Sequence, residues 1–120
     1  MSITKAVGRA ALAALFVIGG SAAATKPTQR VKRLEEAGLP SSALAVRANG
    51  VAMTIAGGML GLGIAPRAAA TVLAVSLVPT TLVGHPFWSE KGEARAAQQT
   101  HFMKNLAILG ALLLVMAEEE

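Results

Sequence analysis

The sequence contains no cysteine and no aspartate, and its aromatic side chains are three Phe and one Trp. Without cysteine, disulfide bonds, thiol catalysis and cysteine-ligated metals are excluded. So few aromatic rings offer no platform on which nucleic-acid bases stack, and we therefore expect no nucleic-acid partner. Charged residues make up 15% of the chain, whereas soluble domains usually have about 25%. This deficit indicates a membrane protein, with the lipid bilayer as its first partner.

Two long apolar runs, residues 43–64 and 68–83, lie at the centre of the chain and are separated by residues 65–67. Each run is close to the ~20 residues that an α-helix needs to cross the hydrocarbon core of a bilayer. They predict membrane-spanning helices over residues 43–64 and 67–83. Because the connection is so short, the two helices must be antiparallel neighbours.

Apolar runs towards the ends of the chain predict two further helices, over residues 7–24 and 102–117. The first begins with Lys5 and Arg9 nearby and ends in small residues, which is also the pattern of a cleavable signal peptide. We expect this helix to be retained, because its removal would leave three spans without a fourth to close a bundle. The predicted fold class is all-α, an integral membrane antiparallel four-helix bundle, in one domain over residues 1–120.

The segments between the predicted helices are polar. Residues 25–42 carry many basic side chains and are predicted to form a solvated basic loop; the alternative is a short interfacial helix over residues 31–37. Residues 84–101 are predicted to form an interfacial loop, in which Trp88 lies at the bilayer surface where aromatic residues are enriched. For the last helix, the alternative is a start near Gly92, as an extension into water.

Small and polar residues in the helix predicted over residues 43–64 indicate where neighbouring helices approach. Gly57 and Gly61 form a GxxxG pair, and small residues also recur every four positions, at Ala48, Ala52 and Ala56. We expect these faces to pack within the chain; the alternative is a homo-oligomer through Gly57 and Gly61. The amide of Asn49 lies inside the span and therefore needs a partner on a neighbouring helix or a water.

The adjoining ends of the last two predicted helices carry the side chains with the richest chemistry: His85, Trp88, Glu93, His101, Lys104 and Asn105. A quinone headgroup needs hydrogen-bond donors at the interface, beside an apolar slot for its tail. His85, His101 and Asn105 are candidate donors and Trp88 is a candidate stacking surface, so these four form the candidate quinone headgroup site. The alternative is a folded interfacial loop held by helix capping and aromatic anchoring.

Other chemistries fit the sequence less well. A haem between His85 and His101 matches the residue types, but both residues flank a loop and do not face each other inside helices. Glu93 and His101 offer two metal ligands, too few for a closed zinc site. The sequence shows no phosphate-binding loop, catalytic triad or carboxylate dyad. We therefore predict no catalytic residue and no metal site, and we do not expect the chain to be an enzyme by itself.

Three stretches of the chain resemble the DoxX family: RAAA at residues 67–70, GHPFW at 84–88 and HFMKNLAILG at 101–110. Many members carry a Glu near the middle of the second helix, where this chain has Asn49 as its polar residue. The resemblance implies a small four-helix protein of the bacterial inner membrane. The family takes its name from a subunit of an archaeal thiosulfate:quinone oxidoreductase or quinol oxidase, which implies an association with redox enzymes.

These observations lead to three hypotheses. The first is a non-catalytic subunit or assembly partner of a membrane redox complex with quinone as the linked cofactor. The second is a quinone-binding protein acting at His85, Trp88 and His101. The third is a carrier of a small or lipidic solute beside Pro79, whose missing amide either kinks the helix around a cavity or is tolerated as a bend.

Basic residues predict the orientation. The side with both predicted termini carries Lys5, Arg9 and Arg67, and the opposite side carries Lys26, Arg30, Lys32, Arg33, Lys91 and Arg95. Because basic residues in short loops are retained in the cytoplasm, we predict that both termini lie outside, although Lys5 and Arg9 favour the reverse. An alkaline phosphatase fused to the C-terminus should then be active and a fluorescent protein fused there dark. The opposite pair of results would contradict this orientation.

Overall fold

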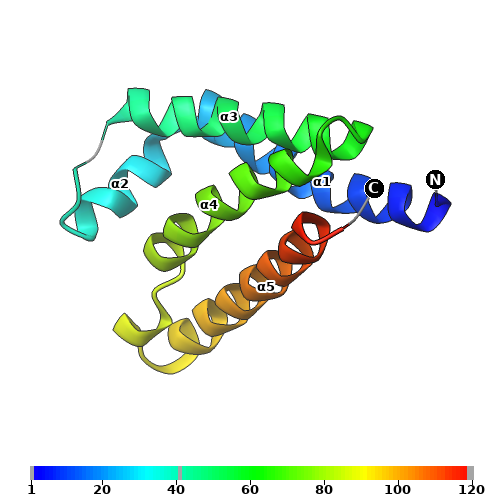
Figure 1. Ribbon diagram of the computed structural model, residues 1–120. Coiled ribbons are helices and arrows are strands. Elements are labelled where there is room, and N and C mark those ends of the chain that lie inside the picture. The colour runs from blue at the N-terminus through cyan, green and yellow to red at the C-terminus, as the bar shows by residue number, and fades with distance from the viewer. Residues whose placement is uncertain (1, 41, 119–120) are drawn as a thin grey trace.

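The computed structural model describes residues 2–40 and 42–118. In these residues the chain is helical and has no strand (Figure 1). The elements are α1 (Ile3–Thr25), α2 (Thr28–Glu36), α3 (Ala43–Leu62), α4 (Pro66–Gly84), the 3₁₀ turn η1 (Phe87–Ser89) and α5 (Gly92–Met116). Within the described residues, four segments are long and apolar enough to cross a membrane: Ile3–Thr25, Ala43–Leu62, Pro66–Ser89 and Gly92–Met116. The predicted all-α membrane bundle is therefore confirmed.

The connection between α3 and α4 is tight because its residues adopt unusual backbone conformations. Gly63 ends α3 with φ 73°, a left-handed conformation that glycine adopts without steric cost. Ala65 is also left-handed, with φ 43°, although its side chain disfavours this region. Pro66 then begins α4 in its first turn, where no helical partner is needed for the missing amide. As predicted, the two spans are antiparallel neighbours.

The basic loop predicted over residues 25–42 is wrong, because half of it forms α2. This helix begins three residues earlier than the alternative that the sequence suggested, directly after the buried Pro27. Its apolar residues Val31 and Leu34 are half-buried, Lys32 and Glu36 are exposed, and the helix contacts both α3 and α4. The helix forms because it covers the ends of two spans with one apolar side while its charges stay in water.

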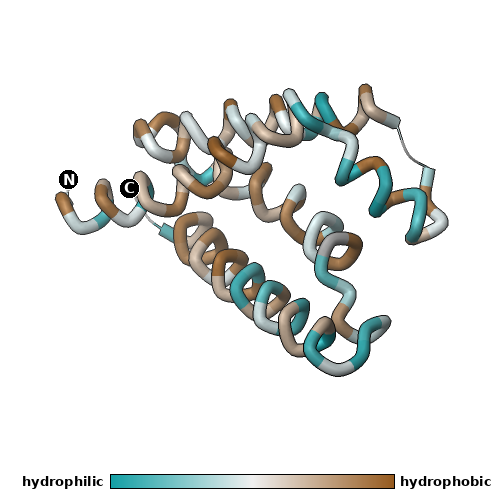
Figure 2. The backbone as a smooth tube through the Cα atoms, turned by 180° about the vertical axis from the view of Figure 1, so that it is seen from behind, coloured by the Kyte–Doolittle hydropathy of each residue, from teal (hydrophilic) through white to brown (hydrophobic). Residues whose placement is uncertain are grey.

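The interfacial loop predicted over residues 84–101 is also shorter than expected. Helix α5 begins at Gly92, as the alternative proposed, so the loop is reduced to the segment around η1. The Ala- and Gln-rich start of α5 favours helix, and Glu93 in its first turn interacts favourably with the helix dipole. Figure 2 shows that this first part of α5 is hydrophilic, as is α2. The helix therefore extends beyond the apolar span that the sequence identified.

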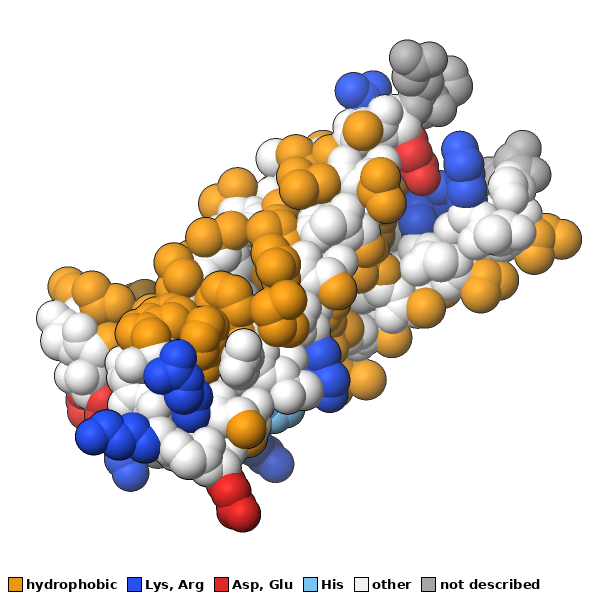
Figure 3. Space-filling view, turned by 90° about the horizontal axis from the view of Figure 1, so that it is seen from below, with side chains coloured by type: hydrophobic (Ala, Val, Ile, Leu, Met, Phe, Trp, Pro, Cys, Tyr) orange, Lys and Arg blue, Asp and Glu red, His pale blue; other side chains and the backbone are white. Residues whose placement is uncertain are grey.

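The long helices contact one another in succession: α1 packs on α3, α3 on α4 and α4 on α5. Contacts are most extensive between α1 and α3, followed by α4 with α5 and α3 with α4. Both described ends of the chain lie near the α3–α4 connection, whereas α2 and η1 lie at the opposite end (Figure 1). The face drawn in Figure 3 shows an apolar band, with most of its charged side chains gathered towards the two ends of the molecule. This distribution matches a bundle whose middle lies in hydrocarbon.

Helices α1 and α3 touch through their backbones at Gly20 and Gly50. A Cβ atom on Gly50 would lie 2.6 Å from the Gly20 carbonyl oxygen and 2.6 Å from the Ala24 nitrogen. Further along, a Cβ atom on Gly57 would lie 3.2 Å from Phe16, and one on Gly61 would lie 3.1 Å from Ala13 on α1. Gly57 and Gly61 therefore pack against α1 within the chain. Helix α1 covers the face that the alternative prediction assigned to a homo-oligomer.

The prediction that Ala48, Ala52 and Ala56 form a packed face is wrong for the first two residues. Ala48 and Ala52 are exposed, and Ala56 is buried. Residues two positions apart on a helix point in nearly opposite directions, so the stripe through Gly50 and Gly57 and the stripe through Ala48 and Ala52 cannot both face α1. The glycines are selected because they allow the closer approach.

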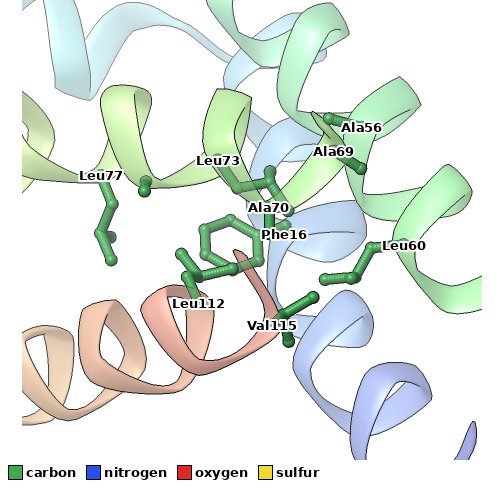
Figure 4. Packing of buried hydrophobic residues seen from close by; sticks show 10 residues of the cluster. Phe16, Ala56, Leu60, Ala69, Ala70, Leu73, Leu77, Leu112 and Val115 are labelled. Carbon is green, nitrogen blue, oxygen red and sulfur yellow. The ribbon is translucent and has the colours of Figure 1, made fainter. Parts of the chain in front are cut away.

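A buried cluster joins α4 and α5 to this pair. The ring of Phe16 is 1% exposed and lies among side chains from α4 and α5 (Figure 4). Leu73 on α4 and Leu112 on α5 are fully buried, and Leu60 contributes from α3. Phe16 therefore connects all four long helices near the end that carries the termini.

A Gly50→Ala substitution should destabilise the bundle, because the new methyl group would meet backbone atoms of α1 that cannot move without separating the helices. We expect a loss of about 1–3 kcal/mol in the free energy of unfolding. The control is Gly58→Ala on the same helix, where a Cβ atom meets nothing within 4 Å. The stability of both variants is measured by titrating the protein in mild detergent with dodecyl sulfate and monitoring unfolding by circular dichroism. Equal stability of the two variants would contradict this account of the interface.

Candidate functional site

The structure brings His85 and His101 together at the end of the α4–α5 hairpin. Their rings are stacked, with centroids 5.1 Å apart and planes inclined by 25°. His85 Nδ1 lies 2.7 Å from Gln98 Oε1. Because an amide oxygen only accepts hydrogen bonds, this contact places the proton of a neutral His85 on Nδ1 and leaves Nε2 as an acceptor. The pair thus offers defined polar atoms at the membrane surface.

Asn105 lies one turn further along α5 and bonds to α4. Its Nδ2 donates to Thr81 Oγ1 over 3.0 Å, and this hydroxyl donates to the Leu77 carbonyl over 2.7 Å. Thr81 is 7% exposed, so the network is held inside the hairpin. In each helix the two polar residues are four positions apart and share a face. The pair His85–His101 and the pair Thr81–Asn105 follow each other between α4 and α5. We call these four residues the polar ladder.

Trp88 belongs to a neighbouring aromatic cluster. It makes edge-on contacts with Phe87 at 5.3 Å and Phe102 at 5.9 Å between ring centroids. The Arg95 guanidinium lies 5.8 Å from the centroid of the Phe87 ring. These contacts hold η1 on α5, which is the anchoring role that the sequence offered as the alternative to a binding site.

The remaining residues of the predicted cluster are peripheral. Glu93 and Lys104 are exposed on α5. Glu93 and His101 are eight residues apart on the same helix, or about 12 Å along its axis, which is too far for them to share a metal ion. His85 and His101 present ring faces to each other, whereas imidazole nitrogens bind iron in the ring plane. The stacked pair therefore does not fit a haem held between the two rings.

A small cavity borders the polar ladder. It has a volume of about 90 Å³ and is lined by residues of α4 and α5, including Thr81, Phe102 and Asn105. Sites for small organic ligands usually have volumes of about 300–1,000 Å³. The cavity beside the ladder is therefore too small to enclose such a ligand.

A larger groove on the other side of α4 was not found by sequence reasoning. It has a volume of about 300 Å³ and lies between α2, α3 and α4. Its polar residues are Arg30, Arg33, Asn49, Ser76 and Thr80, and its apolar residues are Leu34, Leu39, Ala45, Val46, Met53, Pro79 and Val83. Arg30 and Arg33 were assigned to a solvated loop. Two features of the sequence pointed towards this groove: the amphipathic pattern around Leu34 and the hypothesis of a cavity beside Pro79.

A hydrogen bond between α3 and α4 lies in this groove. Ser76 Oγ donates to Asn49 Oδ1 over 3.3 Å, and Asn49 Nδ2 lies 3.5 Å from Met53 Sδ. The prediction that the Asn49 amide finds a partner on a neighbouring helix is confirmed. Pro79 lies inside α4 and lines this groove.

The opposite end of the bundle is tied together by polar contacts. Arg9 and Glu118 approach to 3.8 Å, and Arg67 Nε donates to the Met116 carbonyl over 3.3 Å. These contacts join the start of α1 and the start of α4 to the end of α5. Glu118 is therefore held against the bundle.

The fold, with four apolar helices long enough to span a membrane among the described residues, defines a multi-pass helical membrane protein. The family model for DoxX matches residues 4–86, which is more than half of the chain. This protein belongs to the DoxX family. The match covers α1 to α4 and ends before η1, so the HFMKNLAILG stretch lies beyond it. No curated protein and no solved structure matches the chain.

Proposed function

We propose that this protein is a non-catalytic subunit or assembly partner of a quinone-linked redox complex in the bacterial inner membrane. The observation that carries the proposal is the packing of α5. Among the four described spans its apolar window is the least buried, and its extensive contacts are with α4 and η1. The redox association itself is drawn from the DoxX family, whose name comes from a subunit of such a complex.

The outward face of α5 has the features of a helix-packing surface. A shallow hollow follows one stripe of the helix, formed by Ala96, Gln99, Thr100, Met103, Lys104 and Ala107. Small residues at Ala96 and Ala107 leave room for a neighbouring backbone, and polar side chains between them can bond across an interface. A partner helix that fills this stripe would complete the packing of α5.

Filling the hollow with a large side chain should release the protein from its complex. The wild-type protein is expressed at its native level, extracted in mild detergent and run on a native gel. We expect it to migrate together with a quinone-reducing or quinol-oxidising activity. The Ala107→Phe variant should show less of this comigration. The control is Ile55→Phe, which adds the same ring at an exposed position of α3. Migration of the wild-type protein as a lone monomer would contradict the proposal, as would equal effects of both variants.

The polar ladder supports a second candidate function, the binding of a quinone headgroup. When Nδ1 of His85 donates to Gln98, its Nε2 can accept from a quinol hydroxyl, whereas a quinone carbonyl needs a donor from His101 or from the second N–H of the Asn105 amide. Trp88 is the single Trp of the chain and lies at the same end, in contact with Phe102. Its fluorescence therefore reports on a quinone bound there.

Replacing both histidines of the ladder with phenylalanine should abolish saturable quenching of Trp88 by a short-chain quinone. The double variant His85→Phe, His101→Phe keeps two stackable rings and removes their hydrogen-bonding nitrogens. As a control, Thr100→Ala on the outward side of α5 should quench like the wild type. Unchanged quenching in the double variant would rule out the ladder as the headgroup site without affecting the assembly proposal.

A further inference from the structure

The groove between α2, α3 and α4 is lined by two arginines and by mostly apolar side chains. Helices α3 and α4 meet at the Gly63–Ala65 connection and diverge towards α2, which lies across their open end (Figure 1). Arg30 and Arg33 of α2 are half-buried at this groove, and no acidic side chain is among its described lining residues. Most of the other lining residues are apolar.

Arg30 and Arg33 both line the groove, so an anion there can reach part of each guanidinium group. Arg30 donates one N–H to the Gly19 carbonyl over 3.4 Å, which fixes the side chain against α1. A guanidinium has five N–H donors, so this weak bond leaves others for a ligand. Phosphate is the group that arginine binds best in this way, through paired charge-assisted hydrogen bonds. Partial burial strengthens such bonds because water competes less.

The apolar part of the groove indicates what the anion is attached to. Met53, Pro79 and Val83 belong to membrane-spanning helices, so the groove adjoins the hydrocarbon and the basic residues lie at its surface end. Its volume of about 300 Å³ is at the lower end for ligand sites. A groove of this size has room for the glycerol region and the upper part of an acyl chain, with the rest of that chain in the bilayer.

We propose that this groove binds one anionic phospholipid of the surrounding membrane, with its phosphate on Arg30 and Arg33. The chemistry separates this ligand from the others considered. A quinone headgroup is neutral and gains little from two guanidinium groups, and a free phosphate leaves the apolar lining unfilled. The second N–H of the Asn49 amide can also donate to an ester carbonyl oxygen of the lipid, whereas the Ser76 and Thr80 hydroxyls already donate within the protein. None of the polar ladder lines this groove, so the site stands apart from the proposed function.

Native mass spectrometry of the purified protein tests the assignment. The protein is exchanged into a neutral detergent with equal phosphatidylglycerol and phosphatidylcholine, and bound lipid is counted. We expect one phosphatidylglycerol per chain in preference to phosphatidylcholine, and no displacement by added inorganic phosphate. The double variant Arg30→Gln, Arg33→Gln should lower this preference about tenfold or more, since each lost bond to a charged group is substantial.

Two controls separate the groove from general attraction. Lys26→Gln with Lys32→Gln removes the same charge at two exposed positions outside the groove and should keep the preference. Ala45→Phe narrows the groove without changing charge and should weaken binding. Retention of α-helical circular dichroism shows that each variant is folded. Equal losses in the arginine and lysine variants would overturn the proposal, as would co-purification of a fatty acid or quinone in place of the phospholipid.

Discussion

The backbone contact between α1 and α3 is the constraint on which the rest of the structure depends. In lipid, helices gain no hydrophobic energy by associating, so close packing and interhelical hydrogen bonds must hold them together. At Gly20 and Gly50 the two backbones are so close that either Cβ atom would lie under 3 Å from atoms of the other helix. This approach fixes the rotation of both helices, and it directs Phe16 and Leu60 towards α4 and α5.

The attachment of α4 to this pair at one end produces two sites on different faces of one helix. Ala70 and Leu73 are fully buried near the α3–α4 connection, whereas the later turns of α4 diverge from α3. Along these turns Ser76 and Thr80 line the groove, while Thr81 and His85 contribute to the polar ladder. A change in the tilt of α4 would therefore alter both sites together.

The elements that the sequence predicted are those governed by local rules. Bilayer thickness sets the length of an apolar run, and Gly63 with Pro66 permits a tight turn, so the spans and their antiparallel order follow. The pairing of His85 with His101 follows from the next hairpin, between α4 and α5. The sequence did not identify which small stripe of α3 faces α1, because both have the same spacing. The groove could not be predicted, because it depends on α2, a nine-residue helix stabilised by contacts with α3 and α4.

The two ends of the bundle differ in a way that locates function. At the end with the termini, Arg9 contacts Glu118 and Arg67 bonds to the Met116 carbonyl, so charged groups there are used to close the structure. At the other end, Arg30 and Arg33 lie beside a groove of about 300 Å³ and the ladder presents imidazole nitrogens near the surface. Charge that is costly to hold near lipid persists where it pairs within the protein or binds a ligand. The end formed by α2 and η1 therefore carries both of the ligand sites that we propose.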